Sequence, residues 1–106
     1  MRVLFDQGTP APLRQVLVGN EVSSAYELGW STLKNGELLA AAEANGFGVL
    51  VTTDRQLKYQ QNLASRAIAI VVLGTTSWPR IQASAQAVVG AINAATPGSY
   101  AEVLIP

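Results

Sequence analysis

Short apolar runs alternate along this chain with segments whose apolar residues recur at helical spacing. The clearest runs, Phe47–Thr53 and Ala67–Leu73, lack the polar alternation of a half-exposed strand and predict strands buried on both faces of a sheet. Shorter runs at Arg2–Phe5, Glu21–Ala25 and Tyr100–Ile105 complete the expected strands.

Helical patterns fill most of the intervals between these strands. The expected helices follow residues that commonly cap helix N-termini, which are Thr9, Asn35, Asp54 and Ser77. The last of them should continue to about Ala95. Because strands and helices alternate, the sequence predicts one α/β domain over residues 1–106. Its central five-stranded sheet should be mainly parallel, with helices on both faces in a three-layer α/β/α arrangement.

Composition narrows the chemistry that this domain can perform. Of the 106 residues, 49% are hydrophobic and 13% are charged, which favours an ordered globular fold. Seven basic and seven acidic residues cancel, so no broad cationic field would attract nucleic acid nonspecifically. The chain has no Cys and no His, which excludes disulfides, zinc–thiolate sites, thiol nucleophiles and imidazole bases.

The sequence gives no sign of membrane insertion. The longest apolar run, Ala67–Leu73, is far shorter than the ~20 residues that a membrane-spanning helix needs. The first residues predict a strand and do not resemble a secretory leader. We therefore expect a soluble, cytoplasmic protein.

Two of the expected strands end at a carboxylate, Asp6 and Asp54, and Glu37 lies in the first turn of the helix after the second strand. If the first strand pairs with the third, all three acids face the carboxyl edge of the sheet, where parallel sheets bind their ligands. Clustered carboxylates repel one another unless a cation neutralises them, and oxygen ligands suit Mg²⁺ or Mn²⁺. Such a centre can hydrolyse a phosphodiester without histidine. Alternatively, each acid only caps a helix or complements its dipole.

Three segments carry a resemblance to a known family. They are Leu4–Gln7, Asn35–Leu39 and Val49–Asp54, with Leu57 following. Together they resemble the PIN-like proteins of the DUF5615 type, small relatives of the PIN-domain ribonucleases that often serve as toxins of toxin–antitoxin pairs. The resemblance covers nearly the whole chain and implies a PIN-like fold with metal ligands at the three acids named above. It also implies that a homodimer could form.

The chain departs from the family pattern at two places. Gln7 stands where many relatives have Glu, which removes a negative charge beside the expected metal. The turn at residues 74–77 reads Gly-Thr-Thr-Ser, whereas PIN nucleases commonly carry another acid there. Hydroxyl groups bind divalent ions weakly, so the expected site would hold fewer ions than that of a typical relative.

Other residues have both a functional and a structural interpretation. Arg55 and Lys58 follow the strand-ending Asp54 and could contact an RNA backbone, or they could simply form a solvated helix face. Trp30 and Trp78 lie near strand ends, where they could stack on an unpaired base. Packing in the core or at a subunit interface is the favoured interpretation of both tryptophans.

Two functional hypotheses follow. In the first, the protein is a Mg²⁺- or Mn²⁺-dependent ribonuclease of PIN type whose catalytic and metal-binding residues are Asp6, Glu37 and Asp54. It would act on RNA, as the toxin partner of a small antitoxin-like protein. In the second, it is a catalytically degenerate PIN-like domain that works through protein–protein association. Phosphotransfer receivers also end parallel strands in Asp, but this chain lacks their paired acids near the amino terminus and their lysine after the last buried strand.

Overall fold

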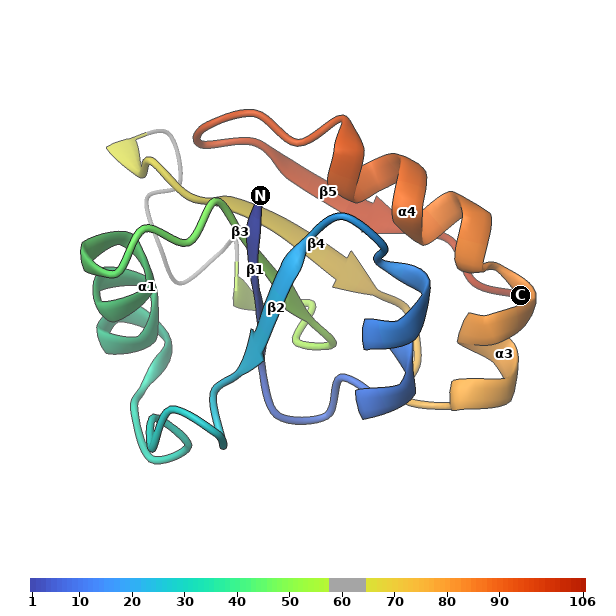
Figure 1. The fold of residues 1–106 in the computed structure, drawn as a ribbon, viewed down its shortest axis with the longest axis horizontal. Coiled ribbons are helices and arrows are strands. Elements are labelled where there is room, and N and C mark those ends of the chain that lie inside the picture. Colours follow the sequence, from blue (N-terminus) through green and yellow to red (C-terminus); the bar gives the residue numbers. More distant parts are fainter. Residues whose placement is uncertain (58–64) are drawn as a thin grey trace.

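The computed structural model describes residues 1–57 and 65–106, and its five strands form one sheet in which all neighbouring strands are parallel (Figure 1). The described elements, in chain order, are β1 (Arg2–Phe5), the 3₁₀ helix η1 (Ala11–Val16), β2 (Glu21–Ser24), α1 (Asn35–Ala44), β3 (Val49–Thr52), β4 (Ala69–Leu73), α3 (Trp78–Ala83), α4 (Ala85–Asn93) and β5 (Tyr100–Val103). The strand order is β2-β1-β3-β4-β5. The expected α/β class with a five-stranded parallel sheet is confirmed.

Each face of the sheet has its own apolar core, because successive side chains of a strand point to opposite sides. On one face, Val3 and Phe5 of β1 belong to a core that η1, α3 and α4 cover. On the other face, Leu4 and Leu50 belong to a core that α1 covers. Figure 1 shows α1 on the opposite side of the sheet from α3 and α4. The helices therefore form two outer layers around the sheet.

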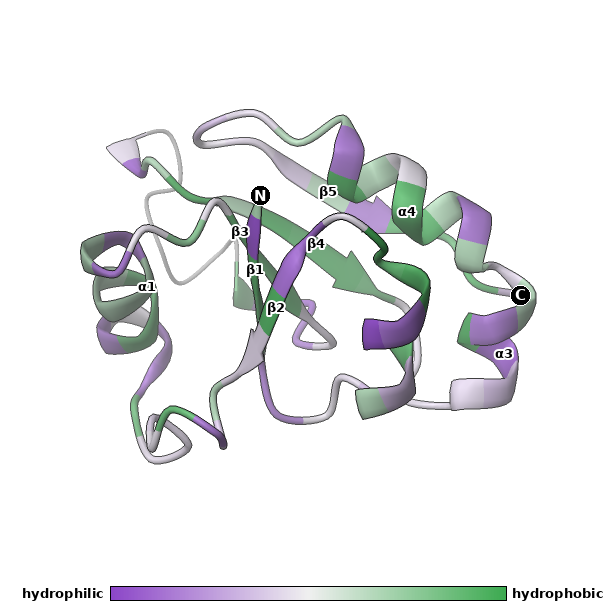
Figure 2. Cartoon of the chain, in the orientation of Figure 1, coloured by the Kyte–Doolittle hydropathy of each residue, from purple (hydrophilic) through white to green (hydrophobic). Residues whose placement is uncertain are grey.

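The inner strands are more apolar than the first edge strand. Every residue of β3 and β4 is buried, whereas no residue of β2 is fully buried. Figure 2 shows β4 in the colours of hydrophobic residues along its length, while β2 carries hydrophilic ones. The long apolar runs in the sequence thus mark the strands that are covered on both faces, as expected.

Two of the expected helices differ in detail from the structure. The segment after Thr9 forms the 3₁₀ helix η1 instead of an α-helix. The Thr9 hydroxyl does not cap η1 and donates to the Val51 carbonyl at 3.0 Å. The helix expected up to Ala95 is interrupted at Ser84, so that α3 packs beside η1 and α4 covers β5. Most of the helix expected after Asp54 lies outside the described residues.

None of the helices within residues 1–57 and 65–106 is long and apolar enough to cross a membrane.

An ion pair fastens η1 to the turn that follows β2. The Arg14 guanidinium contacts the Glu27 carboxylate, whose Oε1 also accepts the backbone N–H of Ser24 at 2.9 Å. These two interactions, with the Arg14 contact the larger, lower the pKa of Glu27 from 4.5 to about 2. The outer edge of β2 is therefore closed at Ser24 by a carboxylate.

Acid should weaken the Arg14–Glu27 ion pair in a defined pH range. Because Glu27 has a lower pKa in the folded chain than when unfolded, its contribution to stability is present above pH 4.5 and is lost as the pH falls toward 2. The loss of stability between about pH 5 and pH 2 in urea unfolding should thus be smaller in Glu27→Gln than in the wild type. An NMR titration that places the Glu27 pKa at its ordinary value would contradict this expectation.

Candidate functional site

The topology singles out the carboxyl ends of β1 and β3. From β1 the chain moves outward to the edge strand β2, and it then returns to build β3, β4 and β5 on the other side of β1. Doubly wound sheets bind their ligands at such a reversal, in the crevice beyond the strand ends. Asp6 directly follows β1, and Asp54 lies two residues after the end of β3. As expected, β1 and β3 are paired neighbours.

A single buried hydroxyl connects the two aspartates. Thr52, the last residue of β3, is completely buried. Its Oγ1 donates a hydrogen bond to Asp6 Oδ2 at 2.9 Å and accepts the backbone N–H of Asp54 at 3.1 Å. The carboxylate of one strand end and the backbone of the other are therefore held by the same side-chain atom.

Neutral donors satisfy the remaining sides of both carboxylates. Asp6 Oδ1 accepts the Gln7 N–H at 2.8 Å, and Asp54 Oδ1 accepts the Gln56 N–H at 2.9 Å. Asp54 Oδ2 accepts the side-chain amide of Asn35 at 3.1 Å. Asn35 was expected to cap α1 but is its first residue, with Lys34 at the N-cap. Its amide instead ties α1 to the end of β3.

The two aspartates remain partly exposed. Both are half-buried, and the ion pairs found among the described residues involve neither of them. A carboxylate oxygen can accept about two hydrogen bonds or ligand contacts, so an oxygen with a single donor among the described residues retains acceptor capacity. Both strand ends thus offer half-buried carboxylate oxygens at the same edge of the sheet.

Glu37 occupies a different local environment. Its exposed side chain accepts the backbone N–H of Lys34 at 3.0 Å, so it satisfies one of the free amides at the start of α1. In the part of the chain that the structure describes, no group of three or more His, Cys, Asp or Glu side chains could hold a metal ion. The structure thus links Asp6 with Asp54 and does not bring Glu37 into a three-acid group with them.

The loop after β1 lies tightly over the end of β3. Gly8 has a φ of +86°, and a Cβ atom there would lie 2.9 Å from the Thr53 hydroxyl oxygen. The next residue, Thr9, is hydrogen-bonded to the carbonyl of Val51. Thr52 belongs to the segment Val49–Asp54 that carries the family resemblance, but from the sequence neither it nor Gly8 was assigned a role. A threonine at the end of an otherwise apolar strand, and a glycine just after a strand-ending acid, are the signals that could have found them.

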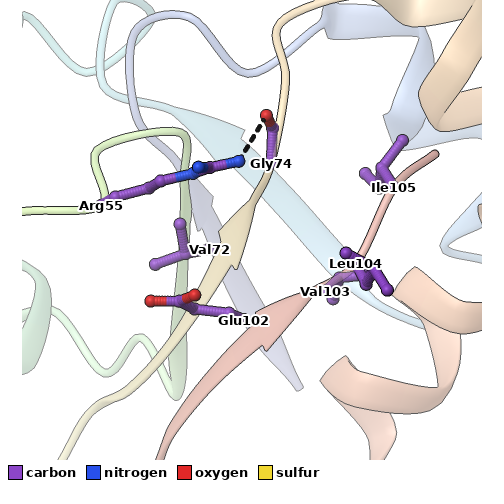
Figure 3. Close-up of a pocket in the computed structure, with 7 residues that line it drawn as sticks. All are labelled: Arg55, Val72, Gly74, Glu102, Val103, Leu104 and Ile105. Atoms are coloured by element: carbon purple, nitrogen blue, oxygen red, sulfur yellow. Dashed lines mark hydrogen bonds between the residues drawn. The ribbon is translucent and has the colours of Figure 1, made fainter.

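The residues expected to contact nucleic acid have mixed outcomes. Arg55 is exposed at the same edge of the sheet, and its Nη2 donates to the Gly74 carbonyl at 3.0 Å (Figure 3). Lys58 lies outside the described residues. Trp30 packs edge-on against Phe47, with ring centroids 6.1 Å apart, and Trp78 packs against the opposite core. The favoured interpretation of both tryptophans as packing residues is therefore confirmed.

Comparison of the chain with protein-family models, curated proteins and solved structures found no match. The PIN-like relationship stays a prediction from the sequence, and the argument for a site rests on the geometry at the ends of β1 and β3.

Removing the Thr52 hydroxyl should loosen this geometry. Thr52→Val preserves the shape of the side chain but leaves the Asp54 N–H without its acceptor, and we expect a loss of about 1–3 kcal/mol in the free energy of unfolding. Thr52→Ser, which keeps the hydroxyl, is the control. Amide exchange at Asp54 should accelerate in the valine variant and not in the serine variant. Equal exchange rates in the two variants would show that the hydroxyl does not hold the strand ends.

The tight approach of Gly8 gives a second prediction. Gly8→Ala introduces both left-handed backbone strain and a clash with Thr53, whereas Gly19→Ala, at a φ of +87° with nothing within 4 Å, introduces the strain alone. The strain costs roughly 1–2 kcal/mol. Urea unfolding should therefore show Gly8→Ala as the less stable variant. Equal stabilities would mean that the loop can move away from β3 at no cost.

Proposed function

We propose that this protein is a metal-dependent ribonuclease of PIN type, in which Asp6 and Asp54 hold Mg²⁺ or Mn²⁺ beside an RNA phosphodiester. The observation that carries the proposal is that the Thr52 hydroxyl holds both the Asp6 carboxylate and the Asp54 backbone N–H, at the point where the strand order reverses. Metal ions and phosphate groups are typical ligands at that position of a parallel sheet. A PIN-like fold, as the sequence resemblance implies, belongs to the same proposal.

The donor set fits a hard divalent cation. Mg²⁺ commonly keeps several water ligands and binds one or two carboxylates together with substrate phosphates, so two aspartates suffice. When bound, the ion would supply Lewis-acid activation of water and of a phosphoryl oxygen. The chain itself would orient the ligands, since Thr52 fixes Asp6 and Asn35 fixes Asp54. We assign Glu37 to the start of α1, where its carboxylate accepts the Lys34 N–H.

Arg55 supports the assignment of a phosphate-bearing substrate. It follows Asp54 in the chain, and its exposed guanidinium lies over the loop after β4. Only one of its nitrogens makes a hydrogen bond among the described residues. The other N–H groups could therefore donate to a phosphate next to the one being cleaved.

A second candidate function is association without catalysis. It is favoured by the lack of a three-acid group within residues 1–57 and 65–106, and by the absence of an acid in the turn after β4. In this version, the PIN-like domain would bind a small antitoxin-like protein or a second copy of itself. The aspartates would then serve only to order the strand ends.

Divalent-ion binding and RNA cleavage separate these candidates. We expect millimolar Mn²⁺ to raise the melting temperature of the wild type and to support cleavage of a single-stranded RNA. Asp6→Asn and Asp54→Asn should each lower the cleavage rate by about 100-fold. Glu37→Gln should retain both properties, and Glu21→Gln, which changes an exposed acid on β2, is the matched control.

Three outcomes would change the assignment. Loss of cleavage in Glu37→Gln, with the fold intact, would return Glu37 to the metal-binding set. If the wild type neither cleaves RNA nor gains melting temperature with Mn²⁺, the association hypothesis would be favoured instead. Growth arrest on expression that Asp54→Asn abolishes would exclude a purely associative role.

A further inference from the structure

A pocket of about 240 Å³ lies beside the candidate site, between Arg55 and the edge strand β5. Its floor includes the buried Val72 of β4, and its outer wall includes Glu102 and the exposed Leu104. Figure 3 shows Arg55 and Glu102 on either side of Val72. Because Arg55 is the residue after Asp54, the pocket adjoins the proposed cleavage site along the chain.

Opposite charges line this pocket without pairing. The ion pairs found in the described part of the chain do not include Arg55 with Glu102, although both residues line the same cavity. Arg55 uses Nη2 to bind the Gly74 carbonyl, and Glu102 Oε1 accepts the Tyr100 hydroxyl at 2.9 Å. One wall thus offers further N–H donors, and the other offers a carboxylate oxygen that can only accept while it is ionised.

The volume and the polarity indicate a small ligand. The volume is below the roughly 300–1,000 Å³ of typical drug-sized ligand pockets, so it suits a single ring system better than an oligomer. Val72 and Leu104 supply apolar contact for the faces of such a ring. Its edge would need an acceptor facing Arg55 and an amino donor facing Glu102.

We infer that this pocket is a base subsite that prefers an amino-bearing base such as cytosine to uracil. The inference rests on the proposed function, because RNA is the substrate class that brings a base beside the cleaved phosphodiester. Glu102 would accept the exocyclic N4 amino group of cytosine while Arg55 donates to a ring nitrogen or carbonyl. Uracil carries a carbonyl oxygen in place of that amino group. This oxygen would face the Glu102 carboxylate, and neither group could donate a hydrogen bond to the other.

Binding of single nucleotides tests this inference without any cleavage. Cytidine and uridine monophosphate differ in the base edge alone, so we would titrate each into the ¹⁵N-labelled wild type in the absence of divalent ions. We expect shifts at Gly74 and at residues 102–105, and a Kd about ten-fold lower for the cytidine nucleotide. Glu102→Gln, which adds a donor, should remove the preference, while Glu21→Gln should keep it.

The results distinguish this inference from the nuclease proposal. Equal affinities in the wild type, no binding of either nucleotide, or an unchanged preference in a folded Glu102→Gln would overturn the base subsite. A cytidine preference in a protein that cleaves no RNA would support the subsite and contradict the nuclease. A protein whose cleavage of RNA depends on Asp6 and Asp54, but which binds both nucleotides with equal affinity, would support the nuclease and contradict the subsite.

Discussion

The hydrogen bonds of the Thr52 hydroxyl are the constraint on which the candidate site depends. A buried hydroxyl must be paired, and here its partners come from the ends of two different strands. The parallel register that places Phe5 beside Val51 brings Asp6 within reach of Thr52. The site is therefore a consequence of strand pairing and not of the loops alone. Any change that shifts this register would separate the two aspartates.

The two edges of the sheet differ in ways that bear on function. At the β2 edge, the Glu27 carboxylate accepts the Ser24 N–H and pairs with Arg14, so the N–H of the last residue of this edge strand is already occupied. At the β5 edge, Glu102 instead borders an open pocket. A carboxylate thus binds the backbone of the first edge, whereas beside the second edge Arg55 and Glu102 form no ion pair with each other among the described residues.

Much of the fold could be predicted from the sequence, because hydrophobic runs report burial directly. The long runs gave β3 and β4, and the alternation with helices gave the parallel sheet. The break at Ser84 could not be predicted in this way, because it lets α4 contact β4 and β5 in addition to η1, and only the tertiary structure defines these neighbours. The same holds for Asn35, whose side chain serves Asp54 instead of the helix start. The position of Asp6 and Asp54 at neighbouring strand ends followed from the strand order. Glu37 was grouped with them only because of its position in the chain, and its hydrogen bond from the Lys34 N–H became visible only in the structure.

The hydrogen bonds of the strand ends bear on the proposal that Asp6 and Asp54 bind a cation. Structural carboxylates are often paired with a neighbouring Arg or Lys. In this chain, Glu27 pairs with Arg14 and Glu43 pairs with Arg66. Asp6 and Asp54 instead accept hydrogen bonds from a hydroxyl, a side-chain amide and backbone amides, which orient a carboxylate without cancelling its charge. Both carboxylates therefore lie half-buried at the carboxyl edge of the sheet without an ion-pair partner among the described residues. A divalent ion is the partner that would relieve their repulsion while leaving room for a phosphate group.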